Sequence, residues 1–316
     1  MNKQAVAAEL QTLLREPVKT DAPMSRLTTW NIGGPADFLV YPSSEDELAA
    51  VLVYLAAQHI PWLVIGNGSN LLVGDLGLRG VVIKMGEPFA GAQWRGLTVE
   101  ASAGLLVGAL ALEAAERGAA GLEFARGIPG SVGGAVRMNA GAYGGFIGQF
   151  VTAIHAVDYE GQKLMLTREQ IEFGYRDSSL FRLPAIISRV ILALDPGDRE
   201  QSLAKIKEYQ QKRSLSQPLE FPSCGSVFRN PANDYAGRLI QLAGLQGLQI
   251  GGVAVSQKHG NFFINMGGAT AADARELIAE VQRQVYEYSG IHLEPEVKMV
   301  GEFGGAADES ENSAGQ

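Results

Sequence analysis

Cysteine and histidine are scarce in this sequence, with one cysteine and four histidines among 316 residues. A single cysteine, Cys224, excludes an internal disulfide, and with no histidine near it in the sequence we interpret it as a small packing residue. The scattered histidines offer no zinc cluster. No apolar run reaches the roughly 18 residues of a membrane-spanning helix, and the N-terminus lacks the apolar core of a signal peptide. The sequence therefore predicts a cytoplasmic protein with no metal site and no membrane insertion.

Positive charge is also in short supply. Lysine and arginine total 26 against 34 aspartate and glutamate residues, which gives a net charge of -8. Nucleic-acid binding and adhesion to an anionic membrane both require a basic surface, so this balance argues against either partner. No segment indicates an obligate protein partner. An anionic small molecule must therefore be held by local groups.

Two well-known phosphate-binding strings are missing: the G-x-G-x-x-G of dinucleotide-binding folds and the Gly-Lys-Ser/Thr of P-loops. Glycine itself is abundant, with 39 residues. It collects in IGNGSN (65–70) and GIPGSVGGAVRMNAGAYGG (127–145). Turns of glycine, serine and asparagine present consecutive N–H groups that can surround a pyrophosphate without any lysine. One such stretch alone could simply build a tight loop, but two beside strand-like segments favour a dinucleotide or nucleotide-sugar site.

Helical and strand-like patterns alternate along the first 200 residues, roughly, which predicts an α/β arrangement. Ser44 and Glu47 form a capping box before the helical pattern of residues 45–60, and PWLVIG (61–66) has the composition of a buried strand. AIHAVDYEGQKLML (153–166) predicts a hairpin. A change in composition near residue 200 indicates a domain boundary, and a strong helix is predicted from Thr270 to about Ser289.

Six segments resemble a known family and occur in its order: TTWNIGGPADFLV (28–40), IGNGSN (65–70), GIPGSVGGAVRMNAGAYG (127–144), YRDSS (175–179), PSCGSVFRNP (222–231) and LEPEVKMVG (293–301). The family is that of UDP-N-acetylenolpyruvoylglucosamine reductase, or MurB. The similarity runs from Thr28 to Gly301. The short interval between Arg176 and Ser226 is similar to the shorter branch of the family, which lacks an inserted tyrosine-bearing loop.

The resemblance implies an α+β protein with an FAD-binding fold of the vanillyl-alcohol oxidase/p-cresol methylhydroxylase type, itself two α/β subdomains, plus a C-terminal α/β substrate-binding domain. We expect four parts, an N-terminal helical segment, an FAD-binding domain, a substrate-binding domain and a disordered acidic tail, at residues 1–23, 24–198, 199–302 and 303–316. The implied activity is that of an NADPH-dependent reductase with non-covalent FAD, which makes UDP-N-acetylmuramate from enolpyruvyl UDP-N-acetylglucosamine for peptidoglycan synthesis. Two alternatives stay open: a flavin-dependent alcohol oxidase of the same fold, and a non-catalytic flavin or nucleotide-sugar binding module.

The flavin site implied by the resemblance draws on both glycine-rich stretches. At Gly133 we expect close backbone approach to the cofactor and a positive φ. The implied flavin-binding residues are Gly66, Asn67, Gly68, Ser69, Asn70, Gly130, Ser131, Gly133, Gly134, Asn139, Ala140 and Gly141.

The resemblance also implies three catalytic residues, Arg176, Ser226 and Glu296. Reducing an enolpyruvyl ether leaves negative charge beside a carboxylate, which demands a cation and a proton donor. Arg176 would clamp the carboxylate and Ser226 would protonate the carbanion, while Glu296 would need a raised pKa or a tight partner. Without the resemblance, Arg176 could be a surface partner of Asp177, and Ser226 a turn residue. Sequence alone also cannot choose Glu296 over Glu294.

Substrate contacts are implied for Tyr175, Arg229, Asn230 and Arg213. Arg213 lies with Lys212 on a polar helical stretch, where the pair could meet the UDP phosphates or face solvent. His259 could be a site residue of the second domain or part of a polar turn.

Overall fold

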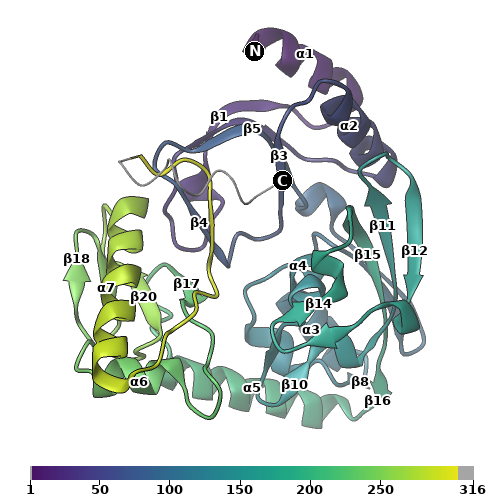
Figure 1. Cartoon of the computed structure of the whole chain (residues 1–316). Coiled ribbons are helices and arrows are strands. Elements are labelled where there is room, and N and C mark those ends of the chain that lie inside the picture. The colour runs from purple at the N-terminus through teal and green to yellow at the C-terminus, as the bar shows by residue number, and fades with distance from the viewer. Residues whose placement is uncertain (1, 305–316) are drawn as a thin grey trace. The chain divides into compact units, whose positions relative to one another are not determined.

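The computed structural model describes residues 2–304, which form two compact units (Figure 1). Unit 1 comprises the residues up to Thr20 together with Phe38–Asn67 and Gly80–Arg213, and unit 2 comprises Asp21–Asp37, Gly68–Arg79 and the chain from Ser214 onward. Two early segments therefore group with the C-terminal part of the chain. A single cut near residue 200 does not describe this grouping.

Unit 1 contains an antiparallel five-stranded sheet in the order β12-β11-β15-β7-β6. The predicted hairpin is confirmed, because β11 and β12 pair antiparallel. Asp158 shapes its turn by accepting the amides of Glu160 at 3.1 Å and Gln162 at 2.7 Å. The strands are β6 (Ala92–Arg95), β7 (Thr98–Ser102), β11 (Val151–Asp158), β12 (Lys163–Thr167) and β15 (Ala185–Ala193).

A second sheet has the order β1-β2-β5-β3. Its strand β3 pairs parallel to β5, from Trp62 with Val81 to Ile65 with Lys84. The sequence predicted a buried strand here, but only Ile65 of β3 is buried, because β3 stands at the edge of the sheet. The strands are β1 (Lys19–Pro23), β2 (Pro35–Val40), β3 (Trp62–Ile65) and β5 (Leu78–Lys84).

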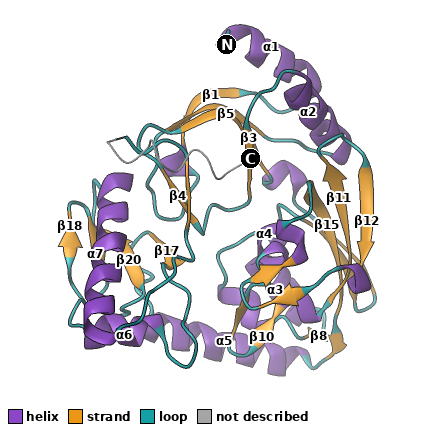
Figure 2. Ribbon diagram, viewed as in Figure 1, coloured by secondary structure: helices purple, strands orange, loops and turns teal. Residues whose placement is uncertain are grey.

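The helices of unit 1 include one that the sequence did not predict, α4, inside the second glycine-rich stretch (Figure 2). Glycine disfavours a helix interior, so the composition indicated turns and tertiary packing decided otherwise. Ser44 caps α2 as predicted, with Oγ accepting the Glu47 amide at 3.1 Å, although the Glu47 carboxylate accepts from Ser43. The helices are α1 (Lys3–Leu13), α2 (Glu45–Ala57), α3 (Val107–Glu116), α4 (Val132–Arg137) and α5 (Arg199–Ser216), whose last turn passes into unit 2.

Three short strand pairs complete unit 1. Two of them are hairpins that present loop residues of the implied site. The pairs are β8 (Ala119–Ala120) with β16 (Asp195–Pro196), β9 (Gly141–Ala142) with β10 (Gly145–Phe146), and β13 (Phe173–Gly174) with β14 (Asp177–Ser178).

Unit 2 packs two helices with an antiparallel sheet in the order β17-β20-β19-β18. The helix predicted from Thr270 is confirmed as α7, which Thr270 caps and Gly290 ends with a φ of 70°. A parallel pair of β4 and β21 explains why early residues belong to this unit. The elements are β4 (Leu71–Val73), β17 (Ser223–Ser226), β18 (Gln249–Ile250), β19 (Val253–Val255), β20 (Phe262–Asn265), β21 (Lys298–Val300), α6 (Ala236–Leu242) and α7 (Ala271–Ser289).

None of the helices among residues 2–304 has the length and apolarity to cross a membrane. In the same range, no group of three or more His, Cys, Asp or Glu side chains is placed to hold a metal ion. Most of the predicted acidic tail, residues 305–316, lies outside the described residues.

Candidate functional site

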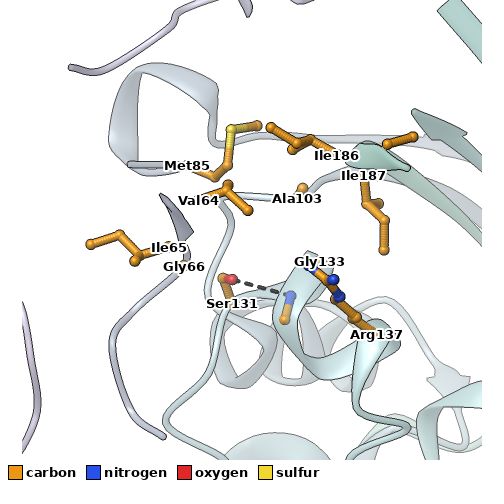
Figure 3. A pocket seen from close by; sticks show the side chains of 12 residues that line it. Val64, Ile65, Gly66, Met85, Ala103, Ser131, Gly133, Arg137, Ile186 and Ile187 are labelled. Carbon is orange, nitrogen blue, oxygen red and sulfur yellow. Dashed lines mark hydrogen bonds between the residues drawn. The ribbon is translucent and has the colours of Figure 1, made fainter. Parts of the chain in front are cut away.

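A largely apolar pocket in unit 1 lies between the end of β3, the start of α4 and β15 (Figure 3). Its cavity volume is about 100 Å³, below the roughly 300–1,000 Å³ of sites that enclose a whole small molecule, so it has room for part of a larger ligand. Four of the implied flavin residues lie on its wall: Gly66, Ser131, Gly133 and Gly134. The remaining lining residues are Val64, Ile65, Met85, Ala103, Arg137, Ala185, Ile186 and Ile187.

The two glycine-rich stretches meet at this pocket. A Cβ atom built on Gly66 would overlap the hydroxyl oxygen of Ser131. Asn67 fixes the same junction, because its Nδ2 donates to the Pro129 carbonyl at 2.6 Å. Segments that lie about 60 positions apart in the sequence are thus held in contact. Only glycine at position 66 permits this contact, because a Cβ atom there would collide with Ser131.

Gly133 lies in the first turn of α4 and its φ is not positive, so the expected positive φ was wrong, whereas its close approach to the cofactor stays a prediction. Its amide donates to the Ala103 carbonyl at 3.0 Å, and the neighbouring Val132 amide donates to the Leu105 carbonyl at 2.7 Å. A Cβ on Gly133 would stand 2.7 Å from the Ala103 Cβ, so glycine here permits helix packing.

We therefore expect Gly133→Val to lower the free energy of unfolding of the protein without FAD by about 1–3 kcal/mol, the usual cost of overpacking. Denaturant unfolding followed by circular dichroism measures it. Gly134→Ala is the matched control, since a Cβ there would lie 3.4 Å from the Ser131 Oγ, an ordinary contact. Equal stability of wild type and Gly133→Val would show that the helix can move away from Ala103.

Arg137 is a pocket residue that the sequence analysis missed. It ends α4, and Figure 3 shows its side chain running back along the helix toward Gly133, the direction that helical side chains take. Burial lowers the pKa of its guanidinium, and its Nε is buried with no hydrogen-bond partner among residues 2–304. A buried donor without an acceptor is costly, which indicates a ligand oxygen at this place. The available signal was a charged residue inside a glycine- and alanine-rich stretch.

These features fit FAD. The pocket supplies apolar walls for a ring system, close backbone approach at Gly66, and a buried guanidinium donor at Arg137. The residues of unit 1 that would hold the cofactor are thus Gly66, Asn67, Ser131 and Arg137. Flavin contacts of the other implied residues stay predictions.

Asn139 and Gly141 hold the hairpin that carries Arg176. Asn139 is buried with a φ of 46°, and its Nδ2 donates to the Gly174 carbonyl at 2.8 Å. Arg176 lies at the turn between β13 and β14 with a φ of 53°, and its Nη1 donates to the Gly141 carbonyl at 3.2 Å. The guanidinium also lies 5.6 Å from the ring centroid of the exposed Tyr175. Positive φ is unfavourable for arginine, so surrounding contacts maintain this turn.

Arg213 lies near the end of α5 and packs on the second glycine-rich stretch. A Cβ on Gly127 would come within 2.6 Å of its Nη1. Burial lowers the pKa of Arg213, and Tyr143 partly opposes that shift. Tyr143 in turn stacks on Tyr209 with ring centroids 4.2 Å apart. Like that of Arg137, the Nε of Arg213 is buried with no hydrogen-bond partner among residues 2–304, and a substrate contact for Arg213 stays a prediction.

Ser226 and Glu296 are backbone neighbours in unit 2. Ser226 ends β17, and the following carbonyl, that of Val227, accepts the Glu296 amide at 2.7 Å. An isolated bridge between Phe228 and Pro295 continues this pairing. Ser226 and Glu296 are both half-buried, whereas Glu294 is exposed. Along the paired backbone, Glu296 therefore lies nearer to Ser226 than Glu294 does, and the choice of Glu296 as the catalytic carboxylate stays a prediction.

Two asparagines fix this segment of unit 2. Asn70 donates from Nδ2 to the Glu296 carbonyl at 3.0 Å, so this implied flavin residue positions Glu296, and its flavin contact stays a prediction. Asn261 is buried and binds the backbone of Phe228. Its Oδ1 accepts the Phe228 amide at 2.9 Å, and its Nδ2 donates to the Phe228 carbonyl at 2.8 Å. No sequence pattern indicated the role of Asn261, because its partner Phe228 lies 33 positions away.

A polar pocket with a cavity volume of about 370 Å³ opens beside Ser226 in unit 2. Asn230 lies on its wall and also accepts the Ala236 amide at 3.1 Å, at the start of α6. His259 lines it too, with Nδ1 accepting the Asn261 amide at 3.1 Å, and burial lowers its pKa. The remaining lining residues are Tyr235, Gly237, Arg238, Gln241, Gln246, Lys258, Gly260 and Asn261.

Cys224 is buried in unit 2, where its interpretation as a packing residue is confirmed. Burial raises the pKa of its thiol, and the charge of Glu296 raises it further. A thiol that stays protonated is a poor nucleophile. Arg229, in contrast, contributes a backbone bond, with its amide donating to the Glu294 carbonyl at 2.9 Å.

Two family models match this chain. An FAD binding domain matches residues 36–166, and the C-terminal domain of UDP-N-acetylenolpyruvoylglucosamine reductase matches residues 217–300. The FAD-binding fold that the resemblance implied is thereby confirmed, as is the mixed helix and strand content.

Proteins from several bacteria are similar over nearly the whole chain. UDP-N-acetylenolpyruvoylglucosamine reductase of Heliobacterium modesticaldum is 47% identical over 287 residues, which cover 90% of this chain and 91% of that protein. The protein of the same name from Moorella thermoacetica is 44% identical over 307 residues, covering 96% and 99%. The crystal structure of MurB from Thermus caldophilus matches with a TM-score of 0.77 at 36% identity, over 90% of this chain and 99% of the other.

Proposed function

Because this chain belongs to the UDP-N-acetylenolpyruvoylglucosamine reductase family, we propose that Arg176, Ser226 and Glu296 carry the family reaction in it. The reaction reduces the enolpyruvyl ether of UDP-N-acetylglucosamine to UDP-N-acetylmuramate, a precursor of peptidoglycan. FAD held by the residues of unit 1 would supply the redox chemistry, by which a hydride from NADPH reaches the vinyl carbon. The protein's own side chains manage the charge and the proton.

Arg176 meets the charge that develops on the substrate. Hydride addition to the vinyl group leaves negative charge on the neighbouring carbon and its carboxylate, which a guanidinium stabilises with paired charge-assisted hydrogen bonds. The bond from its Nη1 to the Gly141 carbonyl and the hairpin turn hold the side chain in advance of substrate binding. Such preorganisation avoids reordering cost at the transition state.

Ser226 and Glu296 handle the proton. The Ser226 hydroxyl donates its proton to the substrate carbanion, and the alkoxide that remains must be reprotonated. Glu296 is the acidic residue on the adjacent backbone and is suited to return that proton. Tyr175, Arg229, Asn230 and Arg213 are proposed substrate contacts, of which Asn230 is supported by its place on the pocket beside Ser226.

The observation that carries this proposal is the bond from the Glu296 amide to the Val227 carbonyl, which places acid and serine on paired backbone segments. The test is an anaerobic assay with NADPH and enolpyruvyl UDP-N-acetylglucosamine, followed by mass spectrometry for a product heavier by two hydrogens. Family membership does not favour the two alternatives. Oxygen-dependent oxidation of an alcohol would indicate the oxidase, and bound flavin without turnover would indicate a binding module.

We expect the cofactor to be bound non-covalently, because neither glycine-rich stretch contains a cysteine or histidine that could form a flavin link. Acid precipitation of purified protein should therefore move all the yellow colour into the supernatant. The absorbance of pellet and supernatant at the flavin bands measures it. Colour that stays in the pellet would require a covalent bond elsewhere in the chain.

The remaining proposals concern setting and domain roles. We propose a small-molecule substrate, no nucleic-acid or obligate protein partner, and a cytoplasmic location. The net charge of -8 supports the absence of a nucleic-acid partner. We assign cofactor binding to residues 24–198 and substrate binding to residues 199–302. The matched family models at 36–166 and 217–300 support that assignment.

A further inference from the structure

We propose that Lys84 is a positioning residue for FAD: its ammonium group holds the Gly66 carbonyl so that the following amides face the cofactor's pyrophosphate. The proposal rests on the proposed function in one respect, that the chain binds FAD. It assigns a purpose to a half-buried cation that neither the sequence motifs nor the catalytic residues explain.

The contact lies wholly within unit 1. Lys84 ends β5 and precedes Met85, a residue of the apolar pocket, while its Nζ donates to the Gly66 carbonyl. Burial lowers the pKa of this ammonium group. A desolvated charge costs free energy unless a partner compensates it, and a single carbonyl dipole compensates only in part. A methionine at this position would pack with less cost, so the lysine calls for an explanation other than stability.

The peptide geometry of the loop supplies that explanation. A trans peptide is planar, so each carbonyl is antiparallel to the N–H of the next residue. The Ile65 carbonyl accepts the Met85 amide at 2.9 Å, and the Gly66 carbonyl accepts Lys84 Nζ. The Gly66 amide therefore points away from Met85, and the Asn67 amide points away from the Lys84 ammonium group.

Both amides are available to a ligand. Among residues 2–304, neither the Gly66 nor the Asn67 N–H has a protein acceptor. Adjacent N–H groups that are not used by the protein form an anion-binding concavity, and pyrophosphate oxygens are acceptors of the matching charge. Without Lys84, the Gly66–Asn67 peptide could rotate, and the concavity would be lost in part of the molecules. The nearby ammonium charge adds to the attraction.

The test uses three variants of the full chain, each stripped of flavin and titrated with FAD by fluorescence quenching. Lys84→Met should raise the Kd for FAD by about 10- to 100-fold, the usual effect of losing a hydrogen bond to a charged group. Lys84→Arg, which keeps a cationic donor, should recover most of the affinity. Lys163→Met is the control, since Lys163 is an exposed residue that pairs with Asp46 at 2.7 Å.

Thermal unfolding of the same flavin-free samples separates positioning from packing. Lys84→Met removes a desolvated charge, so its melting temperature should equal or exceed that of wild type while its FAD affinity falls. A packing role predicts the reverse order of FAD affinities, with Lys84→Met close to wild type and the bulkier Lys84→Arg impaired in both affinity and melting temperature. FAD binding by Lys84→Met that equals wild type overturns the inference alone, whereas wild-type protein that binds no FAD overturns the proposed function.

Discussion

Ser226→Ala is expected to slow transfer of reducing equivalents to the enolpyruvyl substrate by about 10²- to 10⁴-fold, the usual worth of a positioned proton donor. That range corresponds to about 3–5 kcal/mol of activation free energy. Reduction of the cofactor by NADPH needs no proton from this residue, so the rate of that half-reaction should stay close to wild type. The variant thus separates two steps that share one cofactor.

Stopped-flow absorbance measures the two steps on one sample. Bleaching of the flavin bands on mixing with NADPH reports the first, and their recovery on anaerobic addition of enolpyruvyl UDP-N-acetylglucosamine reports the second. Ser223→Ala is a matched control, because Ser223 lies on the same strand and its carbonyl, which the substitution preserves, makes the bond to Thr29 Oγ1 at 2.7 Å. The control should change neither rate by more than a few-fold.

Each other outcome has a distinct meaning. If both steps slowed equally, Ser226 would hold the shape of the site instead of donating the proton. If neither slowed, the proton would come from another group, and Glu296, on the backbone paired with Val227, would be the first to replace by glutamine.

Elements with strong local signals could be predicted from the sequence. The hairpin of β11 and β12 has alternating strands and an Asp158 turn, and α7 has a capping residue at Thr270 and a glycine at its end. In both cases the interactions that fix the element lie within a few residues. Local chemistry and the final fold agree there, so the pattern was sufficient.

Elements fixed by distant contacts could not be predicted. The second glycine-rich stretch has the composition of a loop. Yet its residues 132–137 form α4, because Gly133 permits close packing on Ala103. The grouping of residues 68–79 with the C-terminal part depends on the pairing of β4 (Leu71–Val73) with β21 (Lys298–Val300), which is distant in the sequence. The sequence of neither strand indicates that the other is its pairing partner.

The candidate site shows the same division. The family resemblance named Ser226 and Glu296, and the structure supplied the Val227 carbonyl that joins their backbones. Arg137 lies inside the second glycine-rich stretch and Lys84 lies outside the six family segments, but the sequence analysis assigned a role to neither, because what makes each of them unusual is the partial burial of a charge. A charged side chain looks the same in sequence whether it faces solvent or a cofactor, and only packing distinguishes the two.

Arg176→Met should lower kcat/KM for the enolpyruvyl substrate by about 10²- to 10³-fold, or about 3–4 kcal/mol, because the substrate carboxylate loses its paired cation. Arg176→Lys keeps the charge but loses the planar fork, so its effect should be intermediate. Binding of FAD and its reduction by NADPH should change little in both variants. Steady-state kinetics and the NADPH half-reaction measure these quantities separately.

Arg182→Met is the control for this pair, since Arg182 lies just beyond the same hairpin, is exposed, and has its guanidinium 4.0 Å from the Glu172 carboxylate. It should keep kcat/KM within a few-fold of wild type, as weak surface ion pairs contribute little. Arg176 also bonds the Gly141 carbonyl, so a structural role must be separated from charge stabilisation. If Arg176 only braced the hairpin, lysine and methionine would be equally impaired, and the melting temperature would fall with the activity. A graded loss of kcat/KM at constant melting temperature, with lysine between arginine and methionine, is the result that charge stabilisation requires.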